Sequence, residues 1–297
     1  MPGPVDFHIH SNRSSDGDLP PADIVRMARE RGFAAISIAD HDTVAAYPEA
    51  VETGREAGVE VVPSMEVTSL YDGREFHCLL PFLDWTCPAV AGIAGRVTAG
   101  RLVEAEERVG NLRRLGFDLS WEEVWAASAG MAPLGVTIAR ILLEKPGSRD
   151  VPALRPYFDG DAVRPRGPSF FYRDYFMDGK PAFVPKRHIP LLDLLDLAPE
   201  TGGAAVLAHP GAYFQNTTRE DLAALRARGL QGVEVYTSYH EDGQIGYYAA
   251  AAGDFGLIPT AGSDFHGRVK PHVEFGSIRA GGYWMVEALR ERRKGRS

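Results

Sequence analysis

The sequence contains few residues that could build a covalent or thiolate-bound framework. Only two of its 297 residues are cysteines, Cys78 and Cys87, and neither belongs to a Cys-x-x-Cys pair. We therefore expect neither a disulfide framework nor a zinc ribbon, and the low cysteine content is typical of a reducing compartment.

Long apolar runs and excess positive charge are also lacking. No apolar stretch approaches the roughly 20 residues that cross a bilayer, and the first residues lack the basic and apolar regions of a secretion signal. We therefore expect a cytoplasmic protein with no membrane partner. The net charge of -8 disfavours an extended nucleic-acid-binding surface. A small phosphorylated ligand is still compatible, because local cations and bound metals can hold it.

Strand and helix patterns alternate in the first and last parts of the chain. The periodicity predicts strands at residues 5–10, 34–39, 59–63, 75–82, 204–210, 232–236 and 258–266. It predicts helices between them at residues 20–31, 45–57, 218–228 and 244–255, and a last helix at 284–293. This alternation predicts an α/β fold with a parallel sheet, open or closed into a barrel.

The middle of the chain has a different character. Helical spacing is found at residues 96–115 and 135–143, and Ser120–Glu123 has the pattern of a capping box that starts another helix. Residues 145–180 are rich in Pro, Gly, Arg and Tyr and are predicted as loop. We therefore expect residues 1–88 and 182–297 to form the main domain, with a small helical domain inserted at 89–181.

Histidines and carboxylates gather at the ends of the predicted strands. They are His8, His10, His41, Glu66, His209, Asp264 and His266. His8 and His10 point the same way because side chains alternate along a strand, and Asp264 and His266 have the same spacing. Asp6 lies on the same face of the strand as His8 and His10. It is predicted to orient an imidazole by contacting the ring without binding the metal itself. In parallel α/β folds, functional groups gather at the carboxyl ends of strands.

Each of these residues also has a structural interpretation when taken alone. His209 precedes Pro210 and could be a core histidine, as could His77 on its apolar strand, and Asp16 before Gly17 is typical of a turn. All these interpretations would have to hold together at successive strand ends, so a metal centre is favoured. Imidazole and carboxylate ligands without thiolates suit Mn, Fe, Zn or Mg. A hydroxide bridging two such ions would hydrolyse a phosphate ester, although amide hydrolysis uses similar sites.

These motifs, taken in order, resemble the polymerase-and-histidinol-phosphatase (PHP) family of the amidohydrolase-like superfamily. The motifs are Asp6-x-His8-x-His10, Ser15-Asp16-Gly17, Ala39-Asp40-His41-Asp42, Glu66, His77, Ala208-His209-Pro210 and Gly262-Ser263-Asp264-x-His266. The resemblance implies a distorted (β/α)7 TIM-like barrel with two or three divalent metal ions at its mouth. It implies three ligand groups: His8, His10 and Asp264; Glu66, His77 and His209, with Glu66 bridging to the first metal; and Asp16, His41 and His266.

The insertion is similar to that of the nucleotide phosphatase branch, on the motifs at residues 137–140 and 179–184. The resemblance implies a phosphoesterase that removes the 3′-phosphate of a 3′,5′-bisphosphonucleoside or trims the 5′ end of a short RNA. Glu66, His209 and Asp264 would act in catalysis, with His240 as the general acid. Cations and strand-end residues could hold the substrate: Arg140, Lys180, Lys186, Arg187, Tyr236 and Arg268.

Other assignments stay open from the sequence. His188 and His272 are expected to be structural or on the surface, and residues 170–172 are expected in a packed lid loop. One alternative function is a phosphatase for histidinol phosphate or a sugar phosphate. A second is a non-catalytic metal-binding module, against which the complete ligand set argues. The sequence does not predict the oligomeric state.

Overall fold

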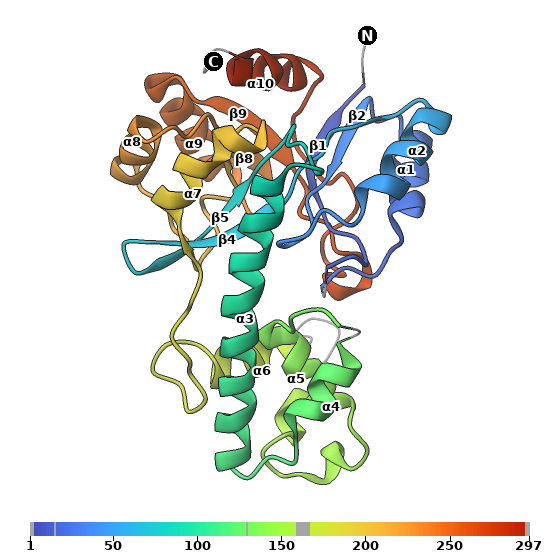
Figure 1. Cartoon of the computed structure of the whole chain (residues 1–297), viewed down its shortest axis with the longest axis vertical. Coiled ribbons are helices and arrows are strands. Elements are labelled where there is room, and N and C mark those ends of the chain that lie inside the picture. Colours follow the sequence, from blue (N-terminus) through green and yellow to red (C-terminus); the bar gives the residue numbers. More distant parts are fainter. Residues whose placement is uncertain (1–2, 15, 129, 159–166, 295–297) are drawn as a thin grey trace. The chain divides into compact units, whose positions relative to one another are not determined.

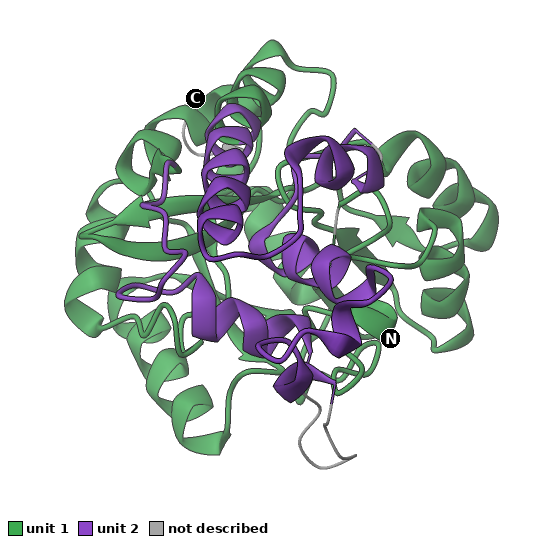
Figure 2. Ribbon diagram, turned by 90° about the horizontal axis from the view of Figure 1, so that it is seen from below, with its two compact units in different colours: residues 1–97, 188–297 green, residues 98–187 purple. Residues whose placement is uncertain are grey.

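The structure is a computed structural model that describes residues 3–14, 16–128, 130–158 and 167–294 (Figure 1). The chain forms two compact units, coloured separately in Figure 2. Unit 1 consists of residues 1–97 and 188–297, and unit 2 consists of residues 98–187. The inserted unit thus begins nine residues later than the predicted boundary at 89 and ends six residues later than 181.

Unit 1 contains two sheets. A parallel three-stranded sheet has the order β1-β2-β3, and a six-stranded sheet has the order β6-β4-β5-β7-β8-β9. The strands are β1 (Val5–Ile9), β2 (Ala35–Ile38), β3 (Glu60–Val61), β4 (Glu66–Tyr71), β5 (Arg74–Leu79), β6 (Ile189–Pro190), β7 (Val206–Leu207), β8 (Gly232–Thr237) and β9 (Ile258–Gly262).

The two sheets join at both edges and close into a distorted barrel. Ile9, at the end of β1, bridges Phe265 just beyond β9, and the His10 N–H donates to the carbonyl of Phe265 at 2.8 Å. On the other side, His41 after β2 forms a parallel bridge with Glu66. Both junctions lie at or beyond strand ends that carry candidate site residues, so closure of the barrel brings those residues together. The predicted TIM-like α/β fold is confirmed.

Helices surround the strands of unit 1. They are α1 (Pro21–Glu30), α2 (Tyr47–Ala57), α7 (Leu191–Leu197), α8 (Arg219–Ala227), α9 (Asp242–Phe255) and α10 (Trp284–Lys294), with short helices η3 (Ala198–Thr201) and η4 (Gly267–Val269). Figure 1 shows α1 and α2 beside β1 and β2, and α8 and α9 beside β8. Helix α10 buries Met285 and Leu289 in one apolar cluster with Val5 and Val206, near the beginnings of β1 and β7. It therefore covers the end of the barrel opposite the mouth.

The antiparallel hairpin β4–β5 is the main departure from the predicted parallel pattern. Its turn contains Asp72 and Gly73 at φ of 49° and 71°, the positive values that a tight two-residue hairpin turn requires. Asp-Gly is a strong hairpin signal that the sequence interpretation did not use. Glu66 lies just beyond β3, as expected, and it is also the first residue of β4.

Unit 2 is helical. Its helices are α3 (Pro88–Arg114, whose first residues belong to unit 1), α4 (Trp121–Ala127), α5 (Gly135–Glu144) and α6 (Pro168–Tyr175), with short helices η1 (Ser148–Asp150) and η2 (Arg155–Tyr157). The capping box is confirmed, because the Ser120 side chain accepts the Glu123 N–H and Glu123 accepts the Ser120 N–H. The loop prediction for 145–180 is wrong at α6, where Phe171 is fully buried in the aromatic core of the unit.

No helix among the described residues is long and apolar enough to cross a membrane.

Candidate metal centre

Six of the nine histidines of the chain converge with three carboxylates in unit 1. They are the nine residues to which the resemblance assigned metal: His8, His10, Asp16, His41, Glu66, His77, His209, Asp264 and His266. Eight of them form three overlapping groups whose donor atoms lie within 4.8 Å of one another. The ninth, His209, places its Nε2 at 3.1 Å from Oε1 of Glu66.

The first group contains His8, His10, Glu66 and Asp264, all buried. Nε2 of His8 lies 3.2 Å from Oε2 of Glu66 and 3.3 Å from Oδ1 of Asp264. Nε2 of His10 lies 3.1 Å and 3.2 Å from the same two oxygens. Four donors from three distant segments thus surround one small volume.

Glu66 lies at the centre of the site, with imidazoles facing both of its oxygens. Oε1 lies 2.8 Å from Nδ1 of His77 and 3.1 Å from Nε2 of His209. Oε2 lies 3.3 Å from Nδ1 of His41, in addition to His8 and His10. A carboxylate with this arrangement can bridge two cations, one at each oxygen.

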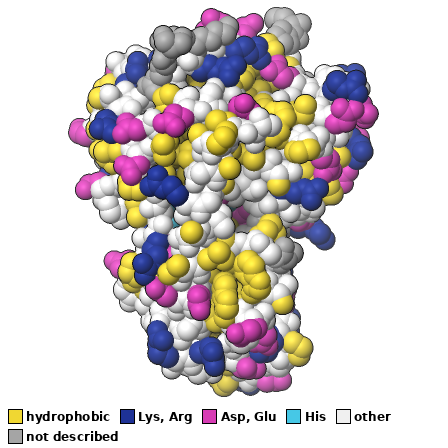
Figure 3. All heavy atoms as spheres, viewed as in Figure 1, with side chains coloured by type: hydrophobic (Ala, Val, Ile, Leu, Met, Phe, Trp, Pro, Cys, Tyr) yellow, Lys and Arg dark blue, Asp and Glu magenta, His cyan; other side chains and the backbone are white. Residues whose placement is uncertain are grey.

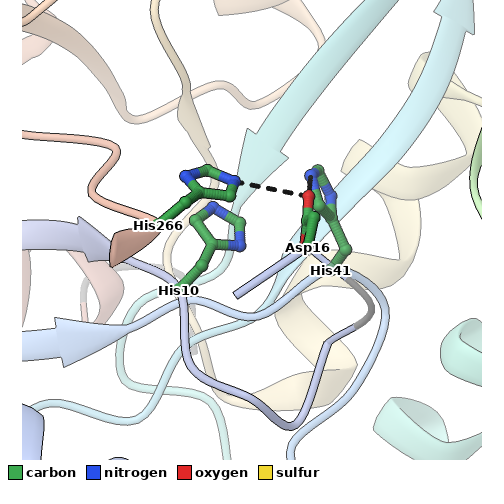
Figure 4. A group of neighbouring side chains, drawn as sticks. All are labelled: His10, Asp16, His41 and His266. Carbon is green, nitrogen blue, oxygen red and sulfur yellow. Dashed lines mark ion pairs between the residues drawn. The ribbon is translucent and has the colours of Figure 1, made fainter. Parts of the chain in front are cut away.

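The second group contains His10, Asp16, His41 and His266 (Figure 4). Oδ2 of Asp16 lies 3.4 Å from Nε2 of His41 and 3.3 Å from Nε2 of His266. Buried Asp40 holds the loop that carries Asp16, since its Oδ1 accepts the Ser11 N–H at 2.7 Å and the Ser14 hydroxyl at 3.1 Å. Asp40 therefore shapes the site without facing into it.

The geometry of the donor atoms fits bound cations. Nε2 of His8 and Nε2 of His10 are 3.1 Å apart, close to the roughly 3 Å that separates neighbouring ligands around an octahedral ion with bonds of about 2.1 Å. Among the described residues, Oε2 of Glu66 has no correctly oriented hydrogen bond although three imidazoles approach it. Oε2 of Glu66 therefore keeps lone pairs that a bound cation can use.

The electrostatics agree with this fit. Burial disfavours the charged forms of His10 and His77. Nearby carboxylates, including Glu66 beside both rings, outweigh the effect of burial and raise both pKa values to about 9. Burial would raise the pKa of Glu66, yet the imidazoles of His41, His8 and His77 hold it well below its usual range. Asp264 is held low in the same way, by Lys270 first and then by histidines. The carboxylates are therefore ionised, and cations compete for the imidazoles with protons.

Two site residues adopt backbone conformations that L-residues rarely occupy. His209 has a φ of 24° and Asp264 a φ of 57°. Such conformations cost on the order of 1–3 kcal/mol each and persist where the surrounding structure imposes them. They aim both side chains toward Glu66 and His8.

Glu234 on β8 is a functional residue that the sequence interpretation missed. Its Oε1 lies 3.2 Å from Nδ1 of His8, and its Oε2 accepts the His209 backbone N–H at 2.8 Å. Gly262 makes room for it, because a Cβ at this position would lie 2.0 Å from Oε1 of Glu234. The available signal was a lone acidic residue within the apolar strand sequence Gly-Val-Glu-Val-Tyr, since buried carboxylates need partners.

The prediction that Asp6 orients an imidazole is wrong. Oδ1 of Asp6 accepts the backbone N–H of His8 at 3.1 Å and of Ser263 at 2.9 Å. Asp6 therefore ties β1 to the end of β9, and Glu234 orients the ring of His8. Burial raises the pKa of Asp6 to about 6, against the lowering effect of these hydrogen bonds.

Lys270 is the cation that adjoins the site, in place of the predicted Arg268. Nζ of Lys270 lies 2.5 Å from Oδ2 of Asp264 and 3.0 Å from the hydroxyl of Tyr239. The Arg268 side chain is 92% exposed and pairs with Asp18. Tyr236 was also expected to line the pocket, but a bulge after Glu234 changes the register and Tyr236 packs against the apolar core.

His240 does not have the geometry of a general acid. It is buried, its Nδ1 lies 2.8 Å from the carbonyl of Val235, and its Nε2 accepts the Gly211 N–H at 2.9 Å. Backbone groups engage both nitrogens, so the ring holds the loop after β7 in place. Burial lowers the pKa of His240, so the ring is neutral near pH 7.

The four cations proposed from the insertion lie in unit 2. Arg140 pairs with Glu144 at 3.1 Å and Arg187 with Glu107 at 2.8 Å, and Lys180 is exposed. Nζ of Lys186 lies 3.1 Å from the hydroxyl of Tyr172. Their part in substrate binding stays a prediction.

Comparisons with known proteins identify the family of the chain. The family described as PHP domain matches residues 6–110. A phosphoribosyl 1,2-cyclic phosphate 1,2-diphosphodiesterase of Eggerthella lenta is 30% identical over 275 residues, covering 91% of this chain and 97% of the relative. The chain belongs to the PHP family. Within the PHP family, a 3′,5′-nucleoside bisphosphate phosphatase of Chromobacterium violaceum is 28% identical over 279 residues, 91% of each chain.

Solved structures agree with this family membership. A protein of Bifidobacterium adolescentis that carries the provisional description of metal-dependent phosphoesterase superposes with a TM-score of 0.81 at 25% identity, covering 98% of both chains. This PHP protein is therefore an enzyme, a metal-dependent phosphoesterase, and its family implies divalent metal ions.

Proposed function

We propose that the enzyme hydrolyses a phosphate monoester of a small nucleotide, of the 3′,5′-bisphosphonucleoside type, using two or three ions of Mn, Fe, Zn or Mg. The observation that carries the proposal is the convergence of imidazoles on both oxygens of Glu66. Similarity over 91% of both chains to the bisphosphate phosphatase of Chromobacterium violaceum supports the substrate class.

The candidate ligands form three sets around Glu66. Divalent ions, when bound, would activate water and neutralise charge on the phosphoryl oxygens. His8, His10 and Asp264 would hold one ion, His77 and His209 a second, and Asp16, His41 and His266 a third, with Glu66 shared. Lys270 places a fixed positive charge beside Asp264, where it can face a phosphoryl oxygen.

A compact ligand agrees better with the surface than an extended nucleic acid does. On the face shown in Figure 3, Lys and Arg side chains are interspersed with Asp and Glu, and the described residues there form no broad basic patch.

A phosphate-release panel with added manganese tests the proposal. It compares 3′,5′-bisphosphoadenosine, adenosine monophosphates, histidinol phosphate, a five-membered cyclic phosphate and a 5′-phosphorylated oligoribonucleotide. We expect fastest release from the bisphosphonucleoside. Preference for histidinol phosphate or the cyclic diester would replace the substrate assignment, and preference for the oligoribonucleotide would make RNA ends the substrate.

The Glu66→Gln variant tests the site itself. The amide cannot bridge two cations, so we expect turnover to be abolished while the metal-free protein still folds. Undiminished activity in a metal-replete variant would refute the role of Glu66. If the wild-type enzyme neither binds metal nor hydrolyses a generic aryl phosphate, the chain is a non-catalytic module.

A further inference from the structure

His77 has carboxylates at both ring nitrogens. Nδ1 lies 2.8 Å from Oε1 of Glu66, and Nε2 lies 3.3 Å from Oε1 of Glu75. His77 and Glu75 are two residues apart on β5 and so share one face of the strand. Because Nδ1 faces the donor group of Glu66 and His41, it supplies the lone pair, and the ring proton belongs on Nε2, where Glu75 accepts it.

Glu75 is held in turn by a second histidine. Nε2 of His188 lies 3.2 Å from Oε2 of Glu75, and the His188 side chain is only 4% exposed. His188 directly precedes β6, whose Ile189 pairs with Ser69 of β4. Strands β6, β4 and β5 are neighbours in that order, so Glu75 lies on the strand on one side of β4 and His188 just before the strand on its other side.

Alternation of side chains places the whole series on one face of this sheet. Phe76 and Cys78 of β5 and Val67 of β4 enter the apolar core. Their neighbours Glu66, Glu75 and His77 therefore point to the opposite face, toward the metal site. On that face, buried His188 and half-buried Glu75 form a chain of polar contacts to His77. Their role is therefore in positioning polar groups, not in apolar packing.

We propose that Glu75 and His188 form a positioning pair that fixes the tautomer and ring orientation of His77, and so sets the affinity of the metal that His77 holds. The inference rests on the metal centre of the proposed function. Carboxylates that accept the second N–H of a ligating histidine orient the ring and raise its basicity, and their loss typically weakens metal affinity roughly 10–100-fold. His188 keeps Glu75 turned toward His77.

Metal binding, measured without substrate, tests the pair. Glu75→Ala is expected to weaken binding of one Mn²⁺ or Zn²⁺ ion by roughly 10–100-fold, measured by chelator competition and by metal content after dialysis. Glu75→Gln is expected to lose less, because its amide oxygen can still accept the Nε2–H. His188→Phe should act in the same direction as Glu75→Ala. All three should leave the metal-free protein folded, with the lower unfolding temperature that loss of a buried hydrogen bond brings.

Glu60→Gln and Glu60→Ala are matched controls. Glu60 is a half-buried carboxylate on β3, in the other sheet, where Tyr283 donates to it at 2.5 Å and Arg290 forms an ion pair with it. We expect both control variants to bind every ion like the wild type. Unchanged affinity in Glu75→Ala, or an equal loss of every ion in the Glu75 and Glu60 variants, would overturn the proposal.

Two further outcomes separate this proposal from the proposed function. A wild-type enzyme that binds metal but releases no phosphate refutes the function and leaves the pair supported if Glu75→Ala still loses one ion. A wild-type enzyme that binds no ion refutes both. If Glu75→Ala fails to fold, Glu75→Gln and His188→Phe decide the matter with the same readout.

Discussion

Nδ1 of His8 lies 3.2 Å from Oε1 of Glu234, a carboxylate 226 residues further along the chain. The contact leaves Nε2 of His8 directed at Glu66 and Asp264. Because the other oxygen of Glu234 accepts the His209 N–H, one carboxylate orients two of the candidate ligands.

Glu234→Gln is therefore expected to weaken metal binding by roughly 10–100-fold. The amide presents one oxygen, so it can accept from His8 or from the His209 backbone but not from both. Isothermal titration with Mn²⁺ measures the loss. Glu220→Gln, an exposed position on α8, is the control and should bind like the wild type; equal affinity in both variants would contradict the orienting role.

Metal binding is expected to release protons and to strengthen as pH rises toward about 9. The pKa values of His10 and His77 are raised from 6.5 to about 9 in the metal-free protein, where carboxylates outweigh burial. A metal needs both rings neutral, so it displaces their protons at pH 7. Titrations in buffers of different ionisation enthalpy count the protons released, and a pH-independent affinity between 6.5 and 9 would contradict the assignment.

The same shifts have the opposite effect on the metal-free fold. A raised histidine pKa stabilises the folded state fully below the unfolded value of 6.5, and this contribution is lost as pH rises through about 9. The unfolding temperature of the chelator-treated protein should therefore fall across this window. The metal-loaded protein should not show this fall.

Lys270→Met is expected to lower kcat/KM by about 100-fold, the usual order for loss of one group that stabilises developing charge. Burial opposes its charge, but Asp264 and Tyr239 raise the pKa of Lys270 above its ordinary value, so it stays positive. Steady-state kinetics on the best substrate provide the measurement. Lys145→Met is the control, because Lys145 is likewise an ion-paired lysine but lies in unit 2, beside Asp118 and Glu123. An equal loss of kcat/KM in Lys145→Met would show that the effect does not depend on the position of Lys270.

His240→Gln is expected to cost stability and to leave the shape of the kcat–pH profile unchanged. The ring satisfies the Gly211 N–H and donates to Val235, and loss of such buried hydrogen bonds costs roughly 1–3 kcal/mol. Chemical denaturation measures the stability, and exposed His272→Gln is the control. Disappearance of the alkaline limb of the profile in His240→Gln would restore the general-acid role.

Short-range patterns allowed much of the fold to be predicted. Most strands and helices of unit 1 lie within a few residues of their predicted positions, because periodic apolar residues mark buried faces. Errors arose where a short polar signal was decisive or where flanking loop composition masked a helix. Asp72-Gly73 turns the chain into an antiparallel hairpin, and Pro168 opens α6 inside a segment otherwise rich in loop residues.

The sequence by itself determined the chemistry of the site, because residue type dictates ligand type and alternation dictates which neighbours share a face. It identified His8, His10, Asp264 and His266 as groups that act in pairs. Only the tertiary structure decided which residues support them, because closure of the barrel joins segments that no local pattern relates. Glu234 reaches His8 and Lys270 reaches Asp264 in this way, while Tyr236 turns into the core at a bulge and His240 is held by the backbone.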